Sequence, residues 1–219
     1  MKAIIFDAFG TLFKVAGGGS AQTVMNHIAA CGVAVDERAF REEWMAFYKA
    51  HTSDGSKFMT ERDIFITRIQ MFYNRYGISR SAENDADALQ KEAFKREAYP
   101  ETKRVLHELM KHHRVFIGSN TDNDALGSVM RRNYIAVHKI YTSEDLKCYK
   151  PDPCFYRAIL NDIGLSPKDV LFVGDSLTDD VQGPRTVGMR SAWLDRTNSG
   201  EAYVQADRIT SLTSLLEIL

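Results

Sequence analysis

Four places along the chain combine a short apolar run with side chains that can take part in group transfer. The first is Asp7, which follows the apolar run 3–6. An Asp at the carboxyl end of a buried strand has a backbone-fixed carboxylate, directed into the crevice where open α/β sheets carry out their chemistry. Asp7 is therefore a candidate nucleophile.

Two further places offer groups that bind anions. Ser119 and Asn120 follow the apolar run 115–118, and a hydroxyl with the amides after it can hold an anionic oxygen. A turn-forming role is the alternative for this pair. Lys150 precedes Pro151, whose ring restricts the backbone, so the ammonium group has a defined direction. A lysine held in this way suits a phosphoryl group, and a solvated surface position is the alternative.

The fourth place is a cluster of carboxylates after the apolar run 170–173. Asp175, Asp179 and Asp180 follow Gly174 in close succession. So much negative charge at one strand end is unfavourable unless a cation or protonation offsets it. Oxygen ligands with open water positions are what Mg²⁺ prefers. A helix-capping role would account for one of these residues but not for all of them.

The spacing of these runs indicates the elements that position the candidate residues. Strand-length apolar runs occur at 3–6, 115–118, 140–141, 170–173 and 191–194. Because helix-length amphipathic segments separate the later runs, we expect an α/β fold with a doubly wound parallel sheet.

The long stretch between the first two strands reads as helical. Its expected helices cover 20–31, 37–52, 61–76 and 82–97. This is too long for one crossover, so we expect an all-helical domain of residues 16–97 inserted into a core made of 1–15 and 98–219. Thr60 with Asp63 is typical of a helix start, and Gly17 to Gly19 suggest a hinge, with a loose loop as the alternative.

Composition narrows the class of protein. The formal net charge of -1 gives no field that would attract nucleic acid or an anionic membrane, and no apolar run approaches the roughly 20 residues that span a bilayer. Cys31, Cys148 and Cys154 are odd in number and lack metal-ligand spacing, so we expect reduced thiols and a cytoplasmic protein.

Together, the four motifs resemble those of the haloacid dehalogenase (HAD) superfamily, which contains many phosphatases as well as dehalogenases. The motifs are, in order, Asp7 to Leu12, Ser119-Asn120, Lys150-Pro151 and Gly174 to Asp180. The helical stretch after the first motif is similar to the cap domain of that family, above a Rossmann-like core.

The resemblance implies a hydrolase with an aspartyl intermediate. Asp7 would be the nucleophile, which divides one high barrier into two lower ones. Thr11 and Ser119 would hydrogen-bond the nucleophile and the transferred group, and Lys150 would neutralise developing charge. Ser119, Asn120 and Lys150 would bind the phosphate of a small organic phosphate.

The resemblance also implies a Mg²⁺ site. Asp7, the main-chain carbonyl of Phe9 and Asp175 would be direct ligands, and Asp180 would hold a coordinated water. The usual spacing of the fourth motif favours Asp180 over Asp179, and a shorter-spaced variant would use Asp179.

Phe9 departs from the phosphatase pattern. Most phosphatases of the family carry a second Asp two residues after the nucleophile, which protonates the leaving oxygen, and a benzyl side chain cannot do this. Losing a general acid costs about two to four orders of magnitude in rate. We therefore expect a Mg²⁺-dependent phosphatase in which another group replaces this acid or whose leaving groups need little protonation.

Two alternatives remain open. A 2-haloacid dehalogenase needs no metal, and it tolerates an aromatic residue at this position because a halide leaves without a proton. Two observations argue against a dehalogenase. The dehalogenases keep uncharged Ser and Asn in the fourth motif, where this chain has Asp175 and Leu177. They also carry an Arg after a Trp in the cap, whereas Met45 follows Trp44 here. The other alternative is a binding protein with vestigial catalysis. The sequence does not identify the substrate, and it does not decide between a monomer and a homodimer.

Overall fold

The centre of the molecule is a parallel β-sheet. The computed structural model describes residues 1–15, 19–52, 57–199 and 206–219. It contains a six-stranded sheet in the order β3-β2-β1-β4-β5-β6, with every neighbouring pair parallel. The strands are β1 (Ala3–Phe6), β2 (Arg114–Ser119), β3 (Lys139–Thr142), β4 (Val170–Gly174), β5 (Arg190–Leu194) and β6 (Asp207–Ile209).

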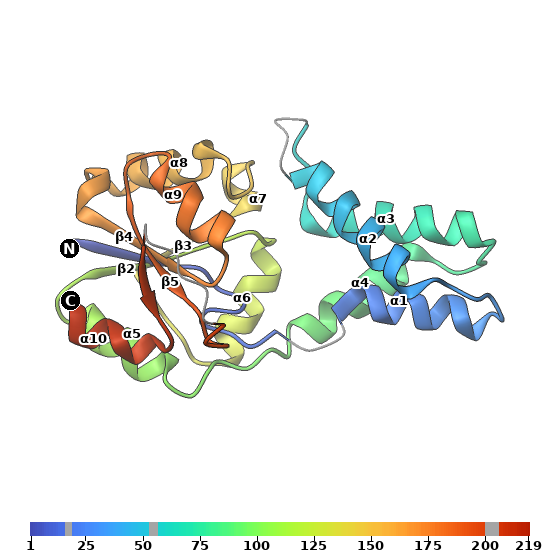
Figure 1. Cartoon of the computed structure of the whole chain (residues 1–219), viewed down its shortest axis with the longest axis horizontal. Coiled ribbons are helices and arrows are strands. Elements are labelled where there is room, and N and C mark those ends of the chain that lie inside the picture. The colour runs from blue at the N-terminus through green and yellow to red at the C-terminus, as the bar shows by residue number, and fades with distance from the viewer. Residues whose placement is uncertain (16–18, 53–56, 200–205) are drawn as a thin grey trace.

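Helices cover both faces of this sheet (Figure 1). One face carries α5 (Thr102–Met110), α6 (Asn123–Arg132) and α10 (Leu215–Ile218), and the other carries α7 (Ser143–Leu146), α8 (Pro153–Ile163) and α9 (Gly183–Arg185). Strand side chains alternate between the two cores. In β1, Ile4 joins the core beneath α5 and α6, and Ile5 joins the core beneath α8. A central strand buried on both faces must be apolar throughout, which explains the run in β1.

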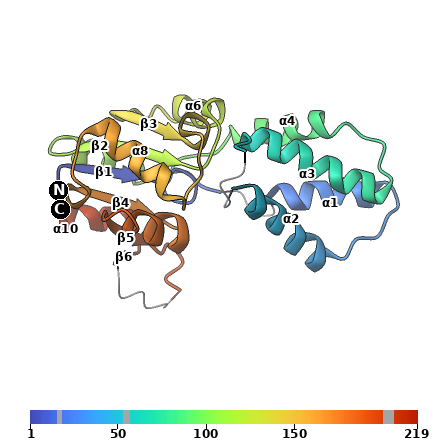
Figure 2. The same cartoon turned by 90° about the horizontal axis from the view of Figure 1, so that it is seen from above.

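The four helices between β1 and α5 form a separate packed unit (Figure 2). They are α1 (Gly19–Ala30), α2 (Glu37–Thr52), α3 (Glu61–Tyr76) and α4 (Ala82–Ala93). Buried aromatic and aliphatic side chains, among them Phe40, Trp44 and Phe72, give this helical insertion its own core. The expected fold class, a doubly wound α/β sheet with an all-helical insertion, is confirmed.

Local signals account for the start and the end of α3. The hydroxyl of Thr60 accepts a hydrogen bond from the backbone N–H of Asp63 at 3.1 Å, which satisfies one of the free donors of the first turn. Gly77 ends the helix with a left-handed φ of 67°, a conformation that costs glycine little.

Two features of the fold differ from the expectation, and a third falls on residues that the structure does not describe. Strand β6 was not expected, because two of its three residues, Asp207 and Arg208, are charged and exposed. Helix α4 ends at Ala93, four residues earlier than expected. The proposed hinge at Gly17 and Gly18 lies outside the described residues. Among the described residues, no helix is long and apolar enough to cross a membrane.

The expectation of three reduced cysteines is wrong for two of them. Cys148 and Cys154 form a disulfide, with their Cα atoms 6.5 Å apart, while Cys31 is free and exposed. The turn containing Pro151 and Pro153 folds the chain back, which brings the two cysteines within the usual bridging distance. Cysteine count and spacing carry no information about this turn.

Candidate active site

Asp7 lies at the carboxyl end of the central strand β1. Its backbone N–H donates to the carbonyl of Val173 at 2.8 Å, so the parallel pairing with β4 continues to this residue. The residue is 7% exposed. Because β1 lies between β2 and β4, the residues that follow those two strands surround the Asp7 carboxylate.

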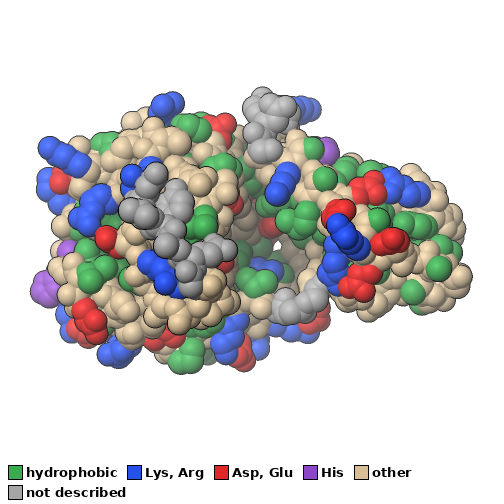
Figure 3. Space-filling view, viewed as in Figure 1, with side chains coloured by type: hydrophobic (Ala, Val, Ile, Leu, Met, Phe, Trp, Pro, Cys, Tyr) green, Lys and Arg blue, Asp and Glu red, His purple; other side chains and the backbone are tan. Residues whose placement is uncertain are grey.

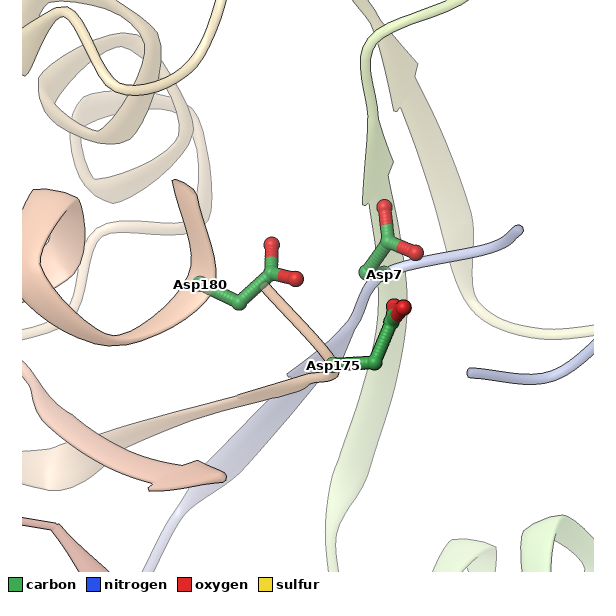
Figure 4. A group of neighbouring side chains, drawn as sticks. All are labelled: Asp7, Asp175 and Asp180. Atoms are coloured by element: carbon green, nitrogen blue, oxygen red, sulfur yellow. The ribbon is translucent and has the colours of Figure 1, made fainter. Parts of the chain in front are cut away.

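Three carboxylates converge at this sheet edge (Figure 4). Asp7, Asp175 and Asp180 each offer an oxygen, and these oxygens all lie within 4.8 Å of one another. Asp175 directly follows β4, and Asp180 comes from the turn after it. Like charges so close together disfavour ionisation of all three unless a cation is present.

Lys150 supplies part of the compensating charge. Its Nζ lies 2.7 Å from Oδ1 of Asp7 and 2.7 Å from Oδ1 of Asp180, and its side chain is 3% exposed. Burial alone would lower the pKa of Lys150, but Asp180 and Asp7 raise it above its ordinary value. The ammonium group therefore stays charged and fixes the two carboxylates in place.

Asp175 has a carboxyl group that protonates easily. Partial withdrawal from water, and then the nearby Asp7, raise the pKa of Asp175 to about 6, although one side of the residue remains open to solvent. Thr11 Oγ1 donates to Asp175 Oδ1 at 3.1 Å, and Trp193 Nε1 donates to the Asp175 carbonyl at 3.1 Å. Gly10, at a φ of 96°, leaves no room for a Cβ beside this carboxylate.

Of the two neighbouring residues Asp179 and Asp180, it is Asp180 that joins the carboxylate cluster. A π-helical turn, Leu177–Gln182, directs Asp180 inward, where it is 1% exposed and accepts from the Ser176 N–H at 3.0 Å. A Cβ at Gly174 would collide with the Asp180 carboxylate, so the fourth motif needs glycine there. Asp179 does not join the three-carboxylate cluster. Burial and the nearby Asp7 raise the pKa of Asp180, with Lys150 opposing.

The second motif contacts both Asp7 and the lysine loop. Ser119 Oγ donates to Asp7 Oδ1 at 3.4 Å. Asn120 Nδ2 donates to the Lys150 carbonyl at 2.9 Å, and the Lys150 N–H donates to Asn120 Oδ1 at 2.7 Å. The Asn120 side chain thus holds the loop that carries Lys150, where the Lys150-Pro151 bond is cis.

Phe9 offers no proton donor at its position. Its ring lies 6.2 Å from that of Phe13, and the Arg96 guanidinium stands 4.3 Å above it. The first motif therefore presents an aromatic face and a cation where a second Asp would present an acid. The Thr11 hydroxyl, expected to hydrogen-bond the nucleophile and the transferred group, donates to Asp175 in this structure.

Two residues at the site were not foreseen from the sequence. Arg196 donates to the carbonyls of Gly10 and Thr11, at 3.2 and 2.7 Å, and pairs with Glu101 at 2.8 Å. It thereby fixes the loop after Asp7. Tyr156 donates to the Asp179 carbonyl at 2.5 Å. Neither had a local signal, because Arg196 is 185 residues from Thr11 in the chain and Tyr156 fits the apolar face of α8.

This arrangement defines a class of enzyme. A carboxylate fixed at a strand end, an ammonium group bridging it to a second carboxylate, and neighbouring hydroxyl donors are suited to nucleophilic catalysis by aspartate. Fold and site together indicate a hydrolase of the parallel α/β type, with Asp7 as the candidate nucleophile.

The chain belongs to the haloacid dehalogenase-like hydrolase family, whose model matches residues 1–188. It is 24% identical to (S)-2-haloacid dehalogenase 4A of Burkholderia cepacia, over 100% of this chain and 93% of that protein. It is 25% identical to glyceraldehyde 3-phosphate phosphatase of Pyrococcus furiosus, over 100% and 93%. The solved structure of the magnesium-bound HAD hydrolase YfnB of Bacillus subtilis shares the fold, with a TM-score of 0.80, 17% identity and coverage of 100% and 98%.

Proposed function

We propose that this hydrolase is a Mg²⁺-dependent phosphatase that acts on a small organic phosphate. The observation that carries the proposal is the third carboxylate, Asp175, beside Asp7 and Asp180. Lys150 offsets one of the three negative charges, which leaves a deficit that a divalent cation would balance. A haloacid carries a carboxylate of its own, which Asp175 would repel.

The donor set fits a magnesium ion. Asp7, Asp175 and Asp180 offer only oxygen atoms, and the solvent-facing side of Asp175 leaves room for water and substrate oxygens, as Mg²⁺ prefers. We assign direct ligation to Asp7, the Phe9 carbonyl and Asp175, and the holding of a coordinated water to Asp180. When bound, the ion would neutralise charge on the transferred phosphoryl group.

The residues of the chain would divide the reaction as follows. Asp7 attacks phosphorus and forms an aspartyl phosphate as the leaving oxygen departs, and water then hydrolyses this intermediate to release phosphate. Ser119 and Lys150 orient the Asp7 carboxylate and stabilise the negative charge of the phosphoryl oxygens. Asn120 keeps Lys150 in position through its reciprocal hydrogen bonds.

The helical insertion would serve as the cap of this site. We propose residues 16–97 as the cap domain and 1–15 with 98–219 as the catalytic core. The core of the insertion is separate from the two cores of the sheet, which supports its folding as a distinct unit that can exclude water from the crevice.

Phe9 favours a second candidate, a 2-haloacid dehalogenase. A departing halide needs no proton, so the aromatic face of Phe9 beneath Arg96 would not hinder that reaction. Asp7 would then attack carbon, with Lys150 beside it. The similarity to a haloacid dehalogenase over the full chain also favours this candidate.

One paired assay separates the two candidates. Phosphate release from a panel of phosphorylated metabolites with Mg²⁺ is measured beside halide release from 2-haloacids with chelator. We expect phosphate release that depends on Mg²⁺, and its loss in Asp7→Asn while the circular dichroism spectrum is unchanged. Halide release without metal would replace the proposal by the second candidate, and neither product would leave a binding role.

A further inference from the structure

The segment that leads into α3 is fixed to the sheet unit at two points. Tyr149 Oη donates to the carbonyl of Met59 at 2.9 Å, and the Asp122 carboxylate accepts the N–H groups of Glu61 and Arg62 at 2.8 Å each. A carboxylate at a helix start is favourable because it meets free donors and the positive end of the helix dipole. Figure 3 shows a cleft between the sheet unit and the helical insertion, and these hydrogen bonds join the two units.

Both anchor points adjoin residues that contact the nucleophile. Tyr149 directly precedes Lys150, whose Nζ lies 2.7 Å from Asp7. Asp122 stands three residues after Ser119, whose hydroxyl lies 3.4 Å from Asp7. The first residue of α3, Glu61, is therefore held between the two loops that meet at the Asp7 carboxylate.

The side chain of Glu61 extends toward the sheet unit. Its Oε2 accepts a hydrogen bond from Thr121 Oγ1 at 3.3 Å. Thr121 is two residues from Ser119, a separation of about 7 Å at full extension. The carboxyl group thus lies beside the segment that follows Ser119, on the side of the helical insertion.

Arg96 is close to both Phe9 and Glu61. The Arg96 guanidinium that covers the Phe9 ring is near enough to Glu61 for the two to influence each other's pKa. Arg96 thus lies near both Glu61 and the aromatic residue at the position of the missing acid.

The charged and titratable groups around Glu61 keep its carboxyl group protonated more readily than usual. Burial, and then Asp122, raise the pKa of Glu61 to about 7, against the opposing effects of Arg96, Thr121 and Arg68. Tyr48 and Tyr149 also face it. A carboxyl group with a pKa near neutrality can both donate and accept a proton under working conditions.

We propose that Glu61 is the general acid and base of this hydrolase, supplied by the helical insertion in place of the acid that Phe9 lacks. This rests on the proposed phosphatase function. As the bond from phosphorus to the leaving oxygen breaks, Glu61 gives its proton to that oxygen, directly or through one water, and an alcohol departs. Glu61 then takes a proton from the attacking water, the bond from phosphorus to Asp7 breaks, and phosphate leaves.

The test uses substituted phenyl phosphates, which vary the leaving group at constant shape. We compare the parent, Glu61→Gln and, as matched control, Asp63→Asn, which removes an exposed carboxylate from the first turn of the same helix. The kcat/KM with saturating Mg²⁺ is measured from p-nitrophenyl to p-methoxyphenyl phosphate, since this parameter includes departure of the phenol. Thermal melting checks that each variant is folded.

An acid matters most where the leaving group is poor. We expect Glu61→Gln to lose about 100-fold or more on p-methoxyphenyl phosphate and far less on p-nitrophenyl phosphate, while Asp63→Asn changes both by the same factor. An equal loss on both esters in Glu61→Gln would overturn the role of Glu61 and leave the phosphatase function intact. Absence of Asp7-dependent phosphate release from the parent would overturn the phosphatase function itself.

Discussion

Replacement of Lys150 by Met tests whether its ammonium group is needed to hold the site carboxylates together. The lysine is 3% exposed and lies 2.7 Å from both Asp7 and Asp180. Methionine keeps most of the apolar stem, so the change removes mainly the charge. Taking one partner from a buried ion pair costs about 3–5 kcal/mol, because the remaining charge is left uncompensated. We expect a loss of this size in the free energy of unfolding without metal.

The loss should depend on pH. Burial already raises the pKa of Asp180, and Lys150 opposes that shift, so the pKa of Asp180 in the folded variant rises further. A group with a raised folded-state pKa binds protons more tightly in the folded than in the unfolded protein, and stability is lost as pH increases. The deficit of Lys150→Met is therefore larger at about pH 8 than at about pH 5.

Urea denaturation followed by circular dichroism measures this loss. Lys139→Met is the matched control, because Lys139 pairs with Asp162 at 2.8 Å but is 51% exposed. Such a surface pair contributes at most about 1 kcal/mol. The reasoning fails if Lys150→Met loses no more stability than Lys139→Met, or if its deficit is the same at both pH values.

Three other predictions concern the metal, the acid and the aromatic residue at the site. Mg²⁺ at 100 times its dissociation constant should stabilise the parent by about 2.7 kcal/mol, and the Asp175→Asn variant should lose most of this stabilisation. Melting curves of the parent that superimpose with and without Mg²⁺ would contradict the metal site. The pKa of Glu61 is raised to about 7, so its ionisation opposes folding by at most about 3 kcal/mol above that pH. Glu61→Gln should therefore gain stability relative to the parent between about pH 5 and pH 8. A constant difference between the denaturant midpoints of the two proteins would count against this. Phe9→Asp should increase kcat/KM for phosphate esters with poor leaving groups more than for p-nitrophenyl phosphate, and more in a Glu61→Gln background than in the parent; equal gains on all esters would mean that the new carboxyl group does not act as an acid.

Much of the fold was predictable because its signals are local. An uninterrupted apolar run such as Ala3–Phe6 is typical of a central strand covered on both faces, and Thr60 with Asp63 correctly indicated the start of α3. Strand β6 carried no such signal. Its charged residues, Asp207 and Arg208, pair at the sheet edge only because β5 is already in place.

Part of the candidate site could also be predicted from local sequence signals, and part could not. Asp7 and Asp175 were found from the sequence because each directly follows a strand, and parallel strands present their carboxyl ends at one edge of the sheet. Lys150 was found from Pro151, which follows it. The disulfide of Cys148 and Cys154 was not predicted, since it depends on how a proline-containing turn folds back.

The sequence by itself therefore determined the position of Asp7 at a strand end, the class of fold and the absence of an acid at Phe9. The tertiary structure decided that Asp180, rather than Asp179, joins the carboxylate cluster, because a π-helical turn directs Asp180 inward. It also brought Glu61 to Thr121, across 60 residues of chain. The residue type and the position of a strand follow from neighbouring residues in the sequence. Contacts between two separately packed units depend on how those units pack together, which no local sequence pattern predicts.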